Sequence, residues 1–70
     1  MSMKRFRVLG EQVLAVIRKT DNYMLVETET VFYILVYDVE NEKWIAVQGF
    51  SKMEYDVNDV IKEFEDFVNV

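Results

Sequence analysis

Hydrophobic positions are densest between Val31 and Phe50, where two apolar runs flank a short polar connection. The first run, residues 31–39, is rich in the β-branched and aromatic side chains that suit a pleated sheet. Both of its alternating sets are apolar, which is typical of a central strand covered on both faces. The second run, residues 43–50, splits in the same way. This pattern predicts a β-hairpin at the centre of the fold.

The polar connection, residues 39–42, has the length of a four-residue hairpin loop. It predicts a register in which Asp38 lies opposite Lys43, an opposite-charge pair across the strands. The same register predicts three further pairs: Tyr37 with Trp44, Val36 with Ile45, and Leu35 with Ala46. One face of the hairpin is then aliphatic, with Ile34, Val36, Ile45 and Val47. The other is aromatic, with Tyr33, Tyr37, Trp44 and Phe50.

The last part of the chain has the pattern of an amphipathic helix. Asp56 suits the N-cap, and Asp59 suits the third helical position. Tyr55 before the cap can pack as a hydrophobic staple on Val60. The run from Ser51 to Glu54 also fits a capping box, which would start the helix one turn earlier. The apolar positions form one stripe, which we expect to cover the aliphatic face of the hairpin: Val57, Val60, Ile61, Phe64, Phe67 and Val68.

Residues 3–20 fit two interpretations. As a helix, their apolar positions recur on one side, although Gly10 in the middle costs about 1 kcal/mol. As strands, Gly10 marks a bend, residues 13–17 form a buried strand, and residues 19–22 turn the chain into a strand from Tyr23 to Thr28. We favour the helix because the apolar stripe extends back to Phe6. The helical stripe consists of Met3, Phe6, Leu9, Val13, Val16, Ile17 and Thr20.

These patterns predict one α+β domain over residues 1–70. We expect a small antiparallel sheet of three to four strands packed against the C-terminal helix. The element order is α-β-β-β-α if residues 3–20 are helical, and β-β-β-β-α if they are strands. With 51% hydrophobic residues in a chain of 70, self-association would add stability that a small core lacks, so we expect a homodimer.

Charge is distributed unevenly along the chain. The net charge is −5, but residues 1–20 carry five cations and one acid, a balance of +4, whereas residues 21–70 carry three lysines and twelve acids, a balance of −9. No apolar run has the length of a membrane span, and no secretory signal pattern begins the chain. The expectation is a cytoplasmic protein that does not associate with membranes.

Catalytic and metal-binding signals are weak. The chain has no histidine and no cysteine, and so lacks the commonest general base, the best nucleophile and the usual zinc ligands. The alternating acids between Asp38 and Glu42 lack the glycine and the later glutamate of a calcium loop. We therefore expect no enzyme activity, no cofactor and no metal site.

The acidic balance favours a small interaction or regulatory module that binds another macromolecule, most simply a basic protein. Carboxylates on such a surface can also occupy a nucleic-acid-binding site where phosphates would lie, so the module can act as an inhibitor or nucleic-acid mimic. The residues expected to form this acidic surface are Glu40, Glu42, Asp59, Glu63 and Asp66.

The alternative is a nucleic-acid-binding module. Aromatic side chains on one sheet face can stack on exposed bases, while nearby cations meet phosphates. The aromatic candidates are Tyr33, Tyr37 and Trp44, and the basic candidates are Lys4, Arg5, Arg7, Arg18 and Lys19.

Two family resemblances rest mainly on the order of elements. With a helical N-terminus, the order α-β-β-β-α and the run Gly49-Phe50-Ser51-Lys52-Met53-Glu54 resemble a double-stranded-RNA-binding domain, which implies RNA binding. Separately, residues 32–68 resemble the strand-hairpin-helix half of HicB-type antitoxins, with Tyr37-Asp38, Trp44 and the helix from Val57 in comparable places.

Overall fold

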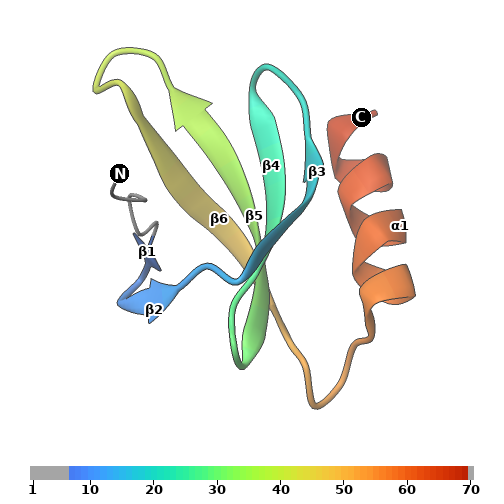
Figure 1. The fold of residues 1–70 in the computed structure, drawn as a ribbon. Helices are drawn as coiled ribbons and strands as arrows, with labels where there is room; N and C mark the ends of the chain where they lie inside the picture. The colour runs from blue at the N-terminus through green and yellow to red at the C-terminus, as the bar shows by residue number, and fades with distance from the viewer. Residues whose placement is uncertain (1–6, 70) are drawn as a thin grey trace.

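The computed structural model describes residues 7–69. They form an α+β fold in which a four-stranded antiparallel sheet is accompanied by a small two-stranded hairpin and followed by one helix (Figure 1). The strands of the larger sheet are adjacent in the order in which they occur in the chain, β3-β4-β5-β6. The elements are β1 (Arg7–Val8), β2 (Glu11–Gln12), β3 (Ala15–Lys19), β4 (Tyr23–Glu27), β5 (Val31–Asp38), β6 (Lys43–Ser51) and α1 (Val57–Val68).

The central hairpin is confirmed as β5 and β6, with the predicted pairs Asp38–Lys43, Tyr37–Trp44, Val36–Ile45 and Leu35–Ala46. The connection spans residues 39–42, as its length predicts. Glu42 ends this loop with a φ of 54°, the left-handed conformation that turns the chain back into a strand. The two strands therefore pair in the predicted register near the loop, with β5 inside the sheet and β6 at its edge.

A β-bulge in β6 changes which side chains share a face. Ile34 pairs with Gln48 while Leu35 pairs with Ala46, so Val47 is the extra residue. Beyond the bulge the alternation of β6 is inverted. Phe50 consequently pairs with Phe32 and is buried among the residues under the helix, so its predicted position on the aromatic face is wrong.

No helix lies between residues 7 and 20, and the favoured helical interpretation of the N-terminal segment is wrong. Leu9 and Gly10 have φ angles of 50° and 85°, which interrupt a helix and instead connect β1 to β2 in a tight turn. Val8, which interrupts the helical stripe, is the buried residue of this hairpin, with 6% of its surface exposed. Met3 and Phe6, on which the helical interpretation also depended, lie outside the described residues.

The strand alternative for this segment is confirmed, although β3 is not buried. It begins at Ala15 and pairs with β4, and the two strands are joined by a turn in which Thr20 N donates to Tyr23 O at 2.8 Å. The register shifts between Val16 and Arg18, and most side chains of β3 are exposed. β3 is thus an exposed edge strand that carries two cations at its end.

Helix α1 is capped as predicted and covers one face of the sheet. The Asp56 carboxylate accepts from Asp59 N, while the Asp59 carboxylate accepts from Asp56 N, which completes a capping box. The residues before it form a turn, so the helix does not start one turn earlier. The core on this side of the sheet comprises Leu25, Phe32, Ile34, Phe50, Val60 and Phe64.

The coverage of the aliphatic face is incomplete. Tyr23 of β4 meets Phe67 edge to face at 5.6 Å, and Figure 1 shows the helix beside β3 and β4. On the distant strand β6, by contrast, Ile45 and Val47 are 39% and 50% exposed. The predicted aliphatic face is therefore buried at Ile34 but open along β6.

Candidate functional site

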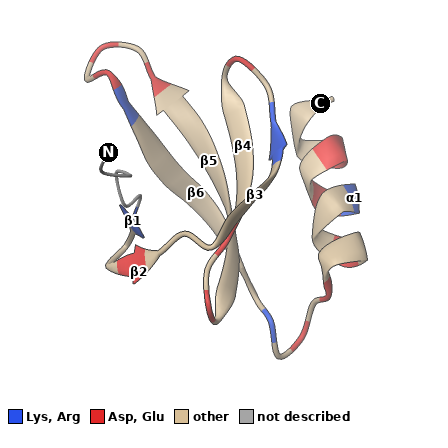
Figure 2. Ribbon diagram, in the orientation of Figure 1, with Lys and Arg blue, Asp and Glu red and all other residues tan. Residues whose placement is uncertain are grey.

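The predicted acidic residues occupy two separate parts of the molecule. Glu40 and Glu42 lie in the loop between β5 and β6, whereas Glu63 and Asp66 lie on exposed positions of α1. Figure 2 shows the loop and the helix on opposite sides of the view. Asp59 is engaged in the capping box, so its carboxylate already has a structural role. The structure does not gather the five acids into one surface.

The loop between β5 and β6 is organised by Asp38. Its Oδ1 accepts from Glu40 N at 3.1 Å, and its Oδ2 accepts from Asn41 Nδ2 at 2.7 Å. The side-chain hydrogen bond from Asn41 holds the pKa of the Asp38 carboxyl below its ordinary value. These bonds fix the loop and leave Val39 exposed between two acids.

The second face of the sheet is partly covered by the β1–β2 hairpin. Val8 packs there in a cluster with Met24, Val26, Tyr33 and Leu35. Only 9% of the Tyr33 surface is exposed, so the ring is part of the core. Tyr33 is therefore unavailable for the base stacking that the nucleic-acid alternative assigns to it.

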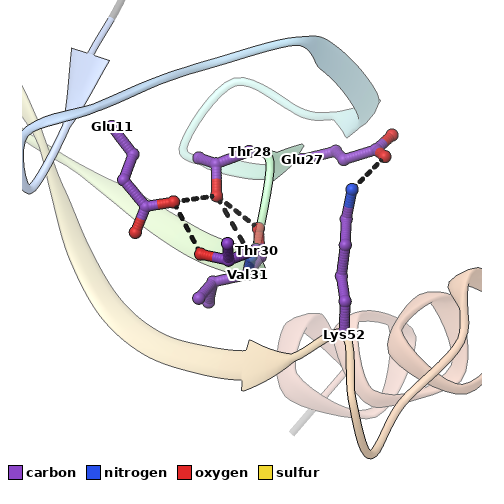
Figure 3. A network of polar contacts seen from close by, with 6 residues as sticks. All are labelled: Glu11, Glu27, Thr28, Thr30, Val31 and Lys52. Atoms are coloured by element: carbon purple, nitrogen blue, oxygen red, sulfur yellow. Dashed lines mark hydrogen bonds and ion pairs between the residues drawn. The ribbon is translucent and has the colours of Figure 1, made fainter.

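A polar network fastens this hairpin to the turn between β4 and β5 (Figure 3). Glu11 Oε1 lies 2.8 Å from the hydroxyl of Thr28 and 2.9 Å from the hydroxyl of Thr30. Thr28 Oγ1 also accepts from Val31 N at 3.1 Å, and the Thr28 side chain is fully buried. The hydroxyl of Tyr33 donates to Glu11 Oε2 at 3.4 Å. Glu11 thus links two segments that are far apart in the sequence.

The network changes the acidity of two groups. Hydrogen bonds from Thr28 and then Thr30 hold the pKa of the Glu11 carboxyl below its ordinary value of 4.5, because they favour the charged form. Burial, with the nearby Glu11 charge as a smaller cause, raises the pKa of the Tyr33 hydroxyl above its ordinary value of 10.0. Figure 3 also shows a separate ion pair, Lys52 with Glu27, between the β6–α1 connection and the end of β4.

Part of the predicted basic and aromatic set does come together. Tyr37 meets the Trp44 ring edge to face at 5.2 Å, and Lys19 Nζ lies 5.7 Å from the centre of that ring. Arg7 lines the same surface depression as Trp44. We call these four residues the Trp44 cluster: Arg7, Lys19, Tyr37 and Trp44.

The other basic candidates lie elsewhere. Arg18 pairs with Leu25, a residue of the core under the helix, so it projects toward the opposite face from Lys19. Lys4 and Arg5 lie outside the described residues. Lys43 pairs with Asp38 next to the Tyr37–Trp44 pair, so it projects toward the opposite face from Trp44.

The described residues contain neither a metal-ligand cluster nor a membrane-spanning helix. Within residues 7–69, no group of three or more acidic, histidine or cysteine side chains is placed to hold a metal ion. Over the same range, no helix has the length and apolar character needed to cross a membrane. What the described side chains offer is charge and aromatic surface for binding.

Comparison with protein-family models, curated proteins and solved structures found no match for this chain.

Proposed function

We propose that this protein is a non-enzymatic interaction module that docks on a basic protein partner through the outer face of α1. The residues that carry this face are Glu63 and Asp66, on the exposed side of the second half of the helix. The hairpin loop with Glu40 and Glu42 provides a second acidic contact on another side of the molecule. The absence of histidine and cysteine from the sequence supports binding over catalysis.

The observation that carries this proposal is the placement of acids against the helix dipole. The C-terminal end of a helix is electronegative, so cations stabilise it and acids destabilise it, each by about 0.3–1 kcal/mol. The last turn of α1 has no basic residue, whereas its second half carries Glu63, Glu65 and Asp66. Because this arrangement destabilises the fold, stability does not explain why these acids are present. A role in binding would explain them.

The acids of α1 form no ion pair among the described residues, although Lys62 lies on the same helix four positions before Asp66. Among the described residues, the ion pair present is Lys52 with Glu27, and neither belongs to the helix. Glu63 follows Asp59 by four positions and precedes Asp66 by three, spacings at which like charges repel along a helix. A basic partner would relieve this repulsion, and the binding would weaken as salt rises.

The test is affinity capture with three forms of the immobilised protein. One form carries Glu63→Gln with Asp66→Gln. A matched control carries Glu29→Gln with Glu54→Gln, which makes the same change in net charge at exposed acids outside the helix. We expect a protein retained by the parent to be retained by the control and lost from the α1 variant. Equal retention by all three forms, or equal loss from both variants, would contradict docking through α1.

The proposed role as a nucleic-acid mimic has its own test. If the carboxylates of α1 occupy a phosphate-binding surface on the partner, an added oligonucleotide will displace the captured partner at fixed ionic strength. A partner that stays bound at saturating oligonucleotide would be docked through a surface that does not bind nucleic acid.

A further inference from the structure

The Trp44 cluster brings cations from two strands to one indole. Arg7 comes from β1 and Lys19 from the edge strand β3. Lys19 reaches across the face of the sheet to lie over the Trp44 ring, while Arg7, whose guanidinium donates to Gly10 O at 3.2 Å, lines the depression beside it. These side chains are distant in the sequence, and the fold concentrates their charge at one place.

The depression beside Trp44 has a volume of about 260 Å³. Pockets for whole drug-sized ligands usually occupy about 300–1,000 Å³, so this one suits a single ring system. Its walls are partly apolar, with Val8, Leu35 and Ala46 beside the indole. An aromatic ring that carries an anionic group would therefore find both an apolar surface and two cations here.

The cations of the cluster are not used in ion pairs within the described part of the chain. None of them has a carboxylate within ion-pair distance among residues 7–69. Both side chains are exposed, so their charges contribute little to the fold. The aromatic members, Tyr37 and Trp44, are only half-buried and present part of their rings at the surface.

We propose that the Trp44 cluster is a binding site for single-stranded nucleic acid. A base stacks on the indole of Trp44 in place of the Lys19 ammonium, and the flexible lysine stem lets that ammonium swing onto a phosphate. Arg7 meets the adjoining phosphate. Bases inside a duplex are stacked on one another, so only an unpaired base can enter the depression.

This site is independent of the docking surface proposed for α1. The helix packs with the Leu25 and Phe64 core, whereas Trp44 belongs with the cluster on the other face of the sheet. The acids of the helix are therefore separated from the bound strand by the sheet itself. Either proposal can fail without affecting the other.

The chain has a single tryptophan, so its fluorescence reports on the site directly. We would titrate oligothymidylate into the protein at several salt concentrations between about 50 and 200 mM and follow both Trp44 emission and the anisotropy of a labelled strand. We expect quenching of Trp44 together with binding that weakens with salt. Two phosphate contacts predict a slope of about −1.4 for log affinity against log salt.

Variants separate this site from general charge attraction. Trp44→Ala should weaken binding about 5- to 150-fold, the usual effect of losing one stacked base. Lys19→Gln should make the salt slope shallower by about 0.7. Lys62→Gln, on α1, is the matched control and should change neither quantity. Circular dichroism shows whether Trp44→Ala still folds, and Lys19→Gln tests the site without altering the indole.

Several results would overturn the proposal. These are no binding at the lowest salt, binding without a change in Trp44 emission, an equal effect of Lys19→Gln and Lys62→Gln, or a duplex that competes as well as the single strand.

Discussion

Replacing Thr28 by valine tests the network that holds the N-terminal hairpin on the sheet. The hydroxyl of Thr28 lies 2.8 Å from Glu11 Oε1 and 2.8 Å from Val31 O, and it accepts from Val31 N at 3.1 Å. Valine keeps the shape but removes the oxygen, so Val31 N loses this acceptor at a buried position. Leaving a buried group unsatisfied costs about 1–3 kcal/mol, and we expect Thr28→Val to lower the free energy of unfolding by that amount.

The matched control is Thr30→Val, because Thr30 is exposed and its hydroxyl makes one hydrogen bond, to Glu11, within the described residues. We expect its cost to stay below about 1 kcal/mol. Urea and thermal unfolding followed by circular dichroism measure both, and each kcal/mol corresponds to about 4–8 °C in Tm for a domain of this size. If Thr28→Val unfolds at the same midpoint as Thr30→Val, the buried hydroxyl is not what fastens the turn.

Four further measurements test the fold and its surfaces. Phe64→Ala empties a position that is 4% exposed in the core under the helix and should cost about 3–5 kcal/mol; a thermal melt like that of the parent would contradict that packing. Glu63→Gln with Asp66→Gln should raise Tm, and an unchanged or lower Tm would contradict the claim that these acids destabilise α1 through its dipole. Because the pKa of Glu11 is lowered in the folded state, its hydrogen bonds stabilise the fold above pH 4.5, and this stabilisation is lost as the pH falls through the folded-state pKa. The free energy of unfolding of a Glu11→Gln variant should therefore fall less than that of the parent as the pH is lowered below 4.5. The expected homodimer, if it pairs through the open edge of β6, should dissociate in Val47→Lys, as measured by sedimentation, whereas a parent that sediments as a monomer would rule it out.

The central hairpin and the helix were predictable because local signals agree there. The four-residue connection fixes the register that places Asp38 opposite Lys43, and the Asp56 cap fixes where α1 begins. The bulge was not predictable, since adding Val47 to an apolar run changes no local pattern. Its effect is nevertheless large, because one extra residue moves Phe50 from one face of the sheet to the other.

The N-terminal segment was mispredicted because its apolar residues satisfy two periodicities at once. Gly10 signals a break, but the tight turn also requires the left-handed conformation at Leu9, a residue type that gives no such signal. The Glu11 network could not be predicted from the sequence either, because Thr28, Thr30 and Tyr33 lie 17, 19 and 22 positions away from Glu11 along the chain. All four residues of the Trp44 cluster were candidates from the sequence, but the fold buries Tyr33 and directs Arg18 to the other face of the sheet.

The architecture accounts for how one small acidic protein can carry two oppositely charged surfaces. The sheet separates α1, with its acids, from the cations around Trp44. The Glu11 network matters for this division, because it fixes the β1–β2 hairpin and so holds Arg7 beside the indole. Of the cations near α1, Lys52 is paired with Glu27 and Lys62 lies in the middle of the helix, so neither lies in its last turn. A sequence shaped by stability alone would place a cation in the last turn of α1, and the acids found there instead are the strongest reason to look for a basic partner on that side.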